Sequence, residues 1–336
     1  MKIIISTILI FFFLNARAQS PELALREFAS GQIKKGVRSI GMGGDGATWG
    51  NYSLVYKDSS TALIDAGNTS YSNGNNFSFT AIGVTTPSLW HGLTIYAIAL
   101  SQNANNISSI LKSPAFGNAP IQTLGNGTNQ SVFLKSAIPI IKKFSAGILL
   151  SYERSQFDAT DVNDNTRFVK YHTDWLPSGG FGLSYQPLPK LLIGLRALFN
   201  NDREVRFDNS NTVAGKASSQ EYRLGASANI WKGAIIDAGL NWRKTQNNIR
   251  NVSTSALEPN IGFEQSLWQK HFAFRFGLDE TSETAGITLK FLPIIADIAY
   301  VHNLGMNRIK EVFGTNSNSV LATIIFNFES YLRNKK

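Results

Sequence analysis

The chain has 336 residues, enough for one large domain or two ordinary ones, and 11% of them are aromatic whereas only 16% are charged. It contains no cysteine, which excludes a disulfide, a thiolate zinc site, a cysteine nucleophile and an acylated lipoprotein cysteine. The net charge of +9 comes from basic residues that are scattered singly, so we expect no nucleic-acid partner. Attraction to an anionic surface or to acidic ligands stays open.

The first residues have the form of a signal peptide. Lys2 gives a basic start, residues 3–14 are an apolar run, and Ala16-Arg17-Ala18 has the small-x-small pattern of a cleavage site. The alternative, a membrane anchor, would need a run of about 20 apolar residues. We therefore predict cleavage after Ala18 and export from the cytoplasm. No later apolar run is long enough for a transmembrane helix, so any membrane span must consist of strands.

A short helix and a glycine-rich segment are predicted next. Ser20 can cap a helix that has Pro21 at its first position and Gly31 just past its end. Residues 41–46 then contain four glycines, which suggest a tight, packed turn. The segment fits no phosphate-binding fingerprint, because no Lys-Ser/Thr pair follows it.

The run Arg38-Ser39-Ile40-Gly41-Met42-Gly43-Gly44, followed by Ser53-Leu54-Val55-Tyr56, resembles the N-terminal segment of the FadL-like (OMPP1/FadL/TodX) outer-membrane barrels. The resemblance is greatest to their Bacteroidota branch, which includes the PorV and PorQ proteins of type IX secretion. It implies that this segment folds into the barrel lumen as a hatch. The hatch residues would be Arg38, Gly41, Met42, Gly43, Gly44, Asp45 and Gly46. Where the family usually has Asn-Pro-Ala-Gly, this chain has Lys57-Asp58-Ser59-Ser60.

Apolar residues alternate with small or polar residues through most of the remaining chain. In residues 179–200, one alternating arm runs from Phe181 to Tyr185 and a second covers residues 191–199. Successive strand side chains point to opposite faces, so each arm has one apolar face. Residues 187–190, Pro-Leu-Pro-Lys, predict the turn of a hairpin, because proline cannot donate to a central ladder.

The same alternation fits a soluble β-sandwich, which also has one apolar face per strand. Three features favour a membrane barrel instead: long apolar rows, opposite faces rich in Gly, Ser, Ala and Asn, and the rhythm of the connections. Brief turns are expected near residues 141–143, 187–190, 231–233, 268–270 and 292–293, and longer polar links at 101–130, 157–177, 208–219, 245–259 and 303–318. Trp90, Trp231, Trp242 and Trp268 fall near strand ends, as in interfacial aromatic girdles.

The number of strands should be even if both termini are periplasmic. One strand beyond those visible from the C-terminus is expected within residues 52–71. We therefore predict an all-β protein, a single closed antiparallel transmembrane β-barrel of about 14 strands with an N-terminal segment plugging the lumen. The expected divisions are a signal peptide at 1–18, a helix and hatch at 19–51, the barrel at 52–329 and a periplasmic tail at 330–336.

Charged residues on the faces opposite the apolar rows are the main candidates for a site. A lipid-exposed Arg or Lys costs about 2–4 kcal/mol at the bilayer midplane, so these residues must line the lumen. They are Glu153, Arg196, Arg223, Asp237, Arg243, Arg275, Asp279, Lys290 and Asp297. They could form salt bridges that fill the lumen, or a polar, partly hydrated path that the hatch closes.

No catalytic or metal-binding pattern is apparent. The four histidines, His91, His172, His271 and His302, lie in separate segments without ligand-like spacing. We expect no enzyme activity, cofactor or metal. As the resemblance implies, the protein would be an outer-membrane barrel that transports or binds a hydrophobic small molecule, or a PorV-like accessory of protein secretion. Its partners would be outer-membrane lipid and either that solute or secretion-machine subunits. The alternative is a non-transporting, structural or partner-binding subunit with a filled lumen.

Overall fold

The computed structural model describes residues 37–42, 61–71, 76–86, 89, 93–112, 120–164, 168–207, 213–247, 252–268, 271–279, 282–291, 293–303 and 317–328. These contain one short helix, α3 (Val37–Gly41), and fifteen strands. The first seven strands are β1 (Thr61–Tyr71), β2 (Asn76–Thr85), β3 (Thr94–Lys112), β4 (Pro120–Ile141), β5 (Phe144–Asp161), β6 (Phe168–His172) and β7 (Leu176–Leu188). The others are β8 (Leu191–Phe207), β9 (Val213–Trp231), β10 (Ala234–Asn247), β11 (Val252–Leu267), β12 (Phe272–Asp279), β13 (Ser282–Phe291), β14 (Ile294–Asn303) and β15 (Ser317–Asn327).

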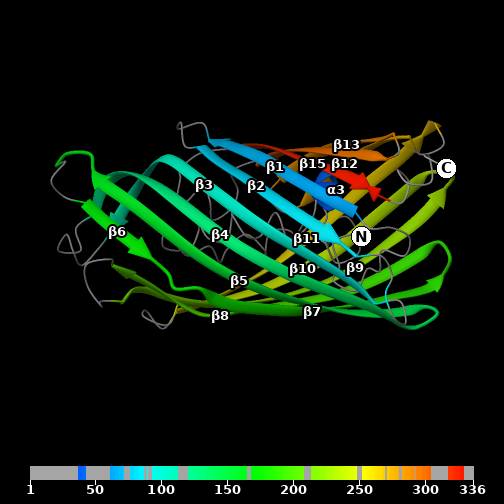
Figure 1. Cartoon of the computed structure of the whole chain (residues 1–336), viewed down its shortest axis with the longest axis horizontal. Coiled ribbons are helices and arrows are strands. Elements are labelled where there is room, and N and C mark those ends of the chain that lie inside the picture. The colour runs from blue at the N-terminus through cyan, green and yellow to red at the C-terminus, as the bar shows by residue number, and fades with distance from the viewer. Residues whose placement is uncertain are drawn as a thin grey trace, which may run out of the picture.

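The strands form one closed antiparallel barrel (Figure 1). Apart from β6 and β7, strands that are neighbours in sequence pair with each other, and β1 pairs with β15 from Thr61↔Asn327 to Tyr71↔Ser317, which closes the sheet. β6 and β7 both pair with β5, so together they occupy one strand position of the barrel, which is interrupted at residues 173–175. We call each such strand position a stave. The barrel therefore has 14 staves, as the sequence predicts.

The apolar rows face outward and do not pack against one another. Ile82, Ile148, Leu224 and Ile324 are each more than half exposed, whereas their neighbours in sequence alternate with them as buried residues. Burial of one face and exposure of a continuous apolar face is the pattern of a sheet that contacts lipid. The β-sandwich alternative is thus excluded, because its apolar rows would form a shared core.

Most of the described residues in the longer polar links expected between strands belong to strands. Residues 101–112 and 120–130 belong to β3 and β4, and β5 continues to Asp161. Segments 213–219 and 252–259 are likewise strand. Polar composition suggested loops there, but the backbone hydrogen bonds of a ladder continue past the apolar belt. Three of the expected brief turns are present: Lys142-Lys143 between β4 and β5, Pro189-Lys190 between β7 and β8, and Lys232-Gly233 between β9 and β10; those expected at 268–270 and 292–293 lie partly outside the described residues.

The staves differ in length around the circumference. We call β12–β15, β1 and β2, together with the segment of β11 from Asn260 to Leu267 that pairs with β12, the low wall, because this part of the sheet is 8 to 11 residues tall. We call β3–β5, β8 and β9 the tall wall, because these strands have 17 to 22 residues. The end with the brief turns is the turn end, and the opposite end, which the tall wall extends, is the rim end.

Aromatic residues mark the turn end. Trp231 and Trp268 are exposed there, next to the brief turns. Trp231 donates its indole N–H to Gln265 Oε1 at 2.9 Å. This position agrees with the girdle predicted from the sequence for these two residues, whereas Trp242 lies within β10 and Trp90 lies outside the described residues.

Candidate functional site

The helix α3 lies on the inner side of the low wall, where it contacts β12 to β15 (Figure 1). Its Ile40 is buried against Ala299, Val301 and Leu321, which are inward residues of β14 and β15. Arg38 of the same helix binds Glu264 of β11 in bidentate fashion, with N–O distances of 2.6 and 2.9 Å. One apolar contact and one ion pair thus hold this part of the predicted hatch against the barrel interior.

Glycines in the wall allow the backbone of α3 to come close. A Cβ atom built on Gly262 would lie 1.9 Å from the carbonyl oxygen of Met42, a position that no side chain can share. A Cβ on Gly41 would lie 3.2 Å from Gly286 Cα. The wall and the helix therefore meet backbone to backbone, so glycine at position 262 is required for this packing.

The Arg38–Glu264 pair continues into a buried ladder of alternating charge across the low wall. Glu264 Oε2 also accepts a hydrogen bond from Arg275 Nε at 2.7 Å, and Arg275 Nη2 reaches Asp297 Oδ1 at 3.1 Å. Thr288 contacts both Arg275 and Asp297. Two cations and two anions alternate, and each carboxylate meets at least one guanidinium, which offsets the cost of burying the charges.

A second buried charge cluster lies on β8, β9 and β10. Three arginines converge on Glu221: Arg223 is hydrogen-bonded to it, Arg243 Nη2 lies 3.1 Å from Oε2, and Arg196 Nη2 lies 3.7 Å from Oε1. Arg196 and Arg223 are each only 1% exposed. These four groups carry three positive charges and one negative charge, whereas the four charged groups of the ladder in the low wall sum to zero.

A further buried carboxylate belongs to Glu153. On the inner face of β5 its carboxylate accepts hydrogen bonds from Ser151 at 3.1 Å and from Ser178 at 3.4 Å, and the two hydroxyls are 2.5 Å apart. Asp237 is also buried, whereas Asp279 and Lys290 are only half-buried near the two ends of the barrel. Gly43, Gly44, Asp45 and Gly46 lie outside the described residues.

The sequence did not point to the two glutamates that organise the charge clusters. Glu221 lies two residues before Arg223 and so points to the same face of the strand. The apolar row that predicts this strand begins only at Tyr222, one residue after Glu221. Glu264 lies on β11, where the connections expected at 245–259 and 268–270 leave residues 260–267 as a strand, but Gln265 interrupts the apolar row of Ile261 and Phe263 and obscures the inner face. Extending the alternation of this strand by one residue toward the N-terminus would have placed Glu221 on the inner face. That Arg275 lies opposite Glu264 depends on the strand register, which only the folded sheet shows.

An apolar patch also faces the lumen, on the opposite side of the barrel from most of the ladder. It consists of Ala81, Ile98, Leu100, Phe133, Leu149 and Leu198, with Phe79, Tyr96 and Ile325 packed against it. The register of residues 93–100 could not be read from the sequence, because both faces of that segment are apolar. The structure shows Ile98 and Leu100 buried on the inner face and Ala99 exposed.

The described residues contain no group of three potential metal ligands. His172, His271 and His302 lie on separate staves or turns, and His91 falls outside the described part of the chain. Among the described segments, no helix has both the length and the apolar character needed to cross a membrane.

No protein-family model matches the sequence, and no curated protein matches it. Solved structures do match. The toluene transporter TbuX of Ralstonia pickettii aligns with a TM-score of 0.57 and 13% identity over 87% of this chain and 97% of TbuX. A FadL homologue of Pseudomonas aeruginosa aligns with a TM-score of 0.54 and 10% identity over 86% and 95% of the two chains. The translocator domain of the autotransporter NalP from Neisseria meningitidis aligns at 0.51 and 10% identity over 93% and 100%.

These identities are too low to transfer an activity, and they establish the architecture alone. The transport barrels TbuX and the FadL homologue match over nearly their whole lengths. The chain therefore has the closed-barrel fold of FadL- and TodX-type outer-membrane transport proteins.

Proposed function

We propose that this protein is an outer-membrane barrel that carries a hydrophobic small molecule through its lumen, with the segment of residues 38–46 as a hatch. The observation that carries the proposal is the seating of α3 on the inner wall by the Arg38–Glu264 ion pair. The buried apolar patch around Phe133 and Leu149 makes part of the inner wall apolar, as the passage of an apolar solute requires. The match to a toluene transporter supports the same class of solute.

Uptake of labelled toluene by intact cells tests the transport step. Cells that lack other barrels of this kind would express the wild-type chain, Phe133→Asp or Val132→Asp. Phe133 is buried in the inner apolar patch, whereas Val132 is half exposed on the lipid side of the same strand. We expect faster uptake than in empty cells with the wild-type chain, and uptake at the empty-cell level with Phe133→Asp although the barrel is folded. Equal uptake by wild-type and empty cells would reject transport of toluene.

Liposome swelling in small sugars tests the hatch separately. Deletion of residues 38–47 should raise passive permeability, and Arg38→Ala should raise it less, because Ile40 still anchors the helix. Lys216→Ala serves as the control, since Lys216 forms a partly exposed ion pair with Glu204 at 3.2 Å, away from α3. Unchanged permeability on deletion would mean that the segment does not close the lumen.

A second candidate is a non-transporting barrel that binds partners, including a PorV-like accessory of protein secretion. The buried charge clusters around Glu221 and Glu264 favour it, because they occupy the lumen with fixed ion pairs. Cross-linking in intact outer membranes, followed by purification, tests this candidate. A stable complex together with the absence of solute uptake would support it, and an isolated barrel that takes up solute would exclude it.

We also propose that the chain reaches the outer membrane after removal of residues 1–18. Mass spectrometry of the purified mature protein should find an N-terminus at Gln19. An intact Met1 would show that the apolar run is retained.

A further inference from the structure

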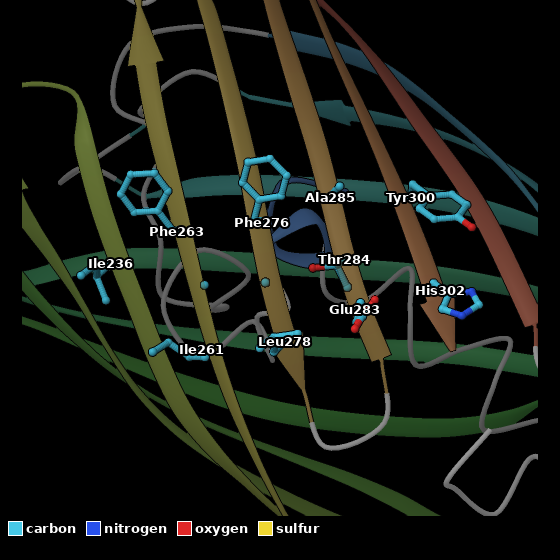
Figure 2. A pocket seen from close by; sticks show the side chains of 12 residues that line it. Ile236, Ile261, Phe263, Phe276, Leu278, Glu283, Thr284, Ala285, Tyr300 and His302 are labelled. Carbon is cyan, nitrogen blue, oxygen red and sulfur yellow. The ribbon is translucent and has the colours of Figure 1, made fainter. Parts of the chain in front are cut away.

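An apolar groove lies on the outer, lipid-facing surface of the barrel. It has a volume of about 640 Å³ and spans β10 to β14 (Figure 2). Its apolar sides include Ile261, Phe263, Phe276 and Leu278, which point toward the viewer in Figure 2, and α3 lies behind the strands. Phe276 and Leu278 are both more than half exposed. The groove therefore opens toward the membrane and not into the lumen.

Small residues between larger ones make the groove concave. Ala285 lies between Phe276 and Tyr300 in the registers of β12–β13 and β13–β14, so the row has a short side chain between two aromatic rings. Gly262 and Gly277, which are paired across β11 and β12, contribute backbone to the floor. A hydrocarbon chain that fills this depression contacts apolar atoms on three sides, which a flat sheet face does not allow.

The groove lies in the half of the membrane that is farther from the brief turns. β12, β13 and β14 have 8, 10 and 10 residues, and strands of about 9–11 residues cross a bilayer at the usual tilt. Phe276, Ala285 and Tyr300 each lie three residues from the rim end of their strand. The short turns of outer-membrane barrels are periplasmic, so the groove faces the outer leaflet. That leaflet supplies lipopolysaccharide, a glycolipid that joins several acyl chains to a sugar headgroup.

The rim end of the groove is polar. Glu283 is opposite His302 in the β13–β14 register, and both line the groove. Glu283 is exposed and is the one residue with a full formal charge among the groove-lining side chains at neutral pH, with histidine neutral. Both residues lie within two positions of the rim ends of their strands. Apolar groove and carboxylate thus match, in order, the hydrocarbon core and the headgroup layer.

The hydrogen bonds at this end leave two neighbouring acceptors. Tyr300 donates its hydroxyl to Asn318 Oδ1 at 2.7 Å, and His302 Nδ1 lies 2.7 Å from the same oxygen. An amide oxygen only accepts, so Nδ1 of the neutral imidazole carries the proton and Nε2 is an acceptor. The carboxylate of Glu283 is the second acceptor. This pair favours a headgroup rich in hydroxyl donors and disfavours direct contact with a phosphate, whose ionised oxygens only accept.

We propose that this groove binds the lipid A part of one lipopolysaccharide molecule, with an acyl chain along Phe276 and Ala285 and a sugar hydroxyl that donates to Glu283. A hydroxyl that donates to a carboxylate forms a charge-assisted hydrogen bond. The groove is continuous with the apolar belt that contacts lipid, so the acyl chain enters it from the membrane. The inference rests on the outer-membrane location, and binding here is independent of solute passage through the lumen.

Native mass spectrometry of the full-length barrel, stripped of lipid in detergent that contains EDTA, tests the proposal. Lipid A and phosphatidylglycerol of the same acyl length would be titrated separately. We expect one bound lipid A with a Kd roughly tenfold below that of phosphatidylglycerol, as one hydrogen bond to a charged group provides. Glu283→Ala should raise the Kd for lipid A roughly tenfold for the same reason. Ala285→Phe should abolish binding of lipid A, because the ring fills the groove.

Two matched controls separate the groove from general effects on the outer surface. Ala226→Phe makes the same change at an exposed position of β9, and Asp158→Ala removes an exposed carboxylate on β5. Both should bind lipid A as the wild type does. Heat-modifiable gel mobility checks that each variant is folded, and Ala285→Leu takes the place of Ala285→Phe if the larger side chain prevents folding.

Three results would overturn the proposal. The first is retention of lipid A by the folded Ala285 variant, or equal Kd values of the wild type for the two lipids. The second is tighter binding of lipid A by Glu283→Ala, because the carboxylate would then repel a phosphate instead of accepting a hydroxyl. The third is a lipid-free dimer that Ala285→Phe converts to monomer, because the groove would then seat a second copy.

Discussion

The low wall and the tall wall of this barrel have the same alternating sequence pattern, but they differ in strand length and in what they contact. The low wall has strands of 8 to 11 residues, and it carries α3 and the ion-pair ladder on its inner face and the apolar groove on its outer face. The tall wall has strands of up to 22 residues, and its inner face carries most of the apolar patch. Strand rise is about 3.3 Å per residue, so the tall strands extend well beyond a bilayer that the low ones just cross.

This difference predicts where amino-acid substitutions are tolerated least. In the low wall, a single strand layer separates α3 on the inner side from the groove on the lipid side. Gly262 is limited on its inner side by Met42, and its backbone lines the groove on the other side. In the tall wall, the segments past the apolar belt are held by the ladder of backbone hydrogen bonds and by exposed or half-buried side-chain pairs such as Lys216–Glu204. Substitutions should therefore cost more in the low wall.

The largest effect is expected from Glu264→Gln. Removal of this carboxylate leaves Arg275 buried with a weakened partner and releases Arg38, and loss of one member of a buried ion pair costs about 3–5 kcal/mol. Denaturant titration of the barrel in detergent, followed by gel mobility of the folded form, measures the loss. Asp158→Asn in the tall wall breaks an exposed pair with Lys170 at 3.8 Å and should cost about 0–1 kcal/mol. Similar losses for both variants would contradict the distinction.

A smaller effect is expected from Gly262→Ala. The added methyl group would occupy the position of the Met42 carbonyl, so α3 must shift or the wall must deform, at a cost of about 1–3 kcal/mol. Liposome permeability should rise as well. The matched change in the tall wall is Gly127→Ala, where the new Cβ would lie 3.2 Å from the ring of Phe157, which can move. If Gly127→Ala were the more permeable variant, the proposed contact of α3 with the wall would be wrong.

The smallest effect is expected from shortening the tall wall. Residues 108–112 and 120–124 form the end of the β3–β4 ladder beyond the pair Ile107 and Gly125, and residues 108–124 are the segment to be replaced. Replacement of these residues by Asn-Gly, which favours a two-residue hairpin turn, should leave the barrel folded with an unchanged denaturation midpoint. Heat-modifiable gel mobility and denaturant titration check this. A large loss of stability would show that the extended strands support the membrane-spanning part.

The sequence allowed the fold to be predicted because a strand in lipid needs an unbroken apolar row, and such rows are easy to see. The number of staves followed from those rows and from the requirement that the strand count be even. The connections expected at 245–259 and 268–270 leave only residues 260–267 for β11, whereas its ladder with β10 continues past Pro259 to Val252. The extended ends of β3 and β4 were taken as loops because polar residues on both faces give no alternation.

The candidate site was predicted only in part, for a related reason. Parity places residues such as Arg275 and Asp297 on the inner face, and both are buried in the structure. The alternation of faces along one strand does not give the register between strands, however. It therefore cannot show that Arg275 lies opposite Glu264 or that Arg223 and Arg243 both bind Glu221. The groove depends on the alignment of Ala285 between two aromatic residues from other strands, which is likewise a property of register.

The pairing of β1 with β15 has a consequence for assembly. Eleven residue pairs join the first strand to the last, so this seam forms only after the whole polypeptide has been delivered. The helix α3 precedes β1 in the chain, yet its seat is made by β12 to β15, the final strands to arrive. Docking of this N-terminal helix therefore cannot precede the folding of β12 to β15, and a fluorescent probe attached at residue 38 would report when these strands are in place.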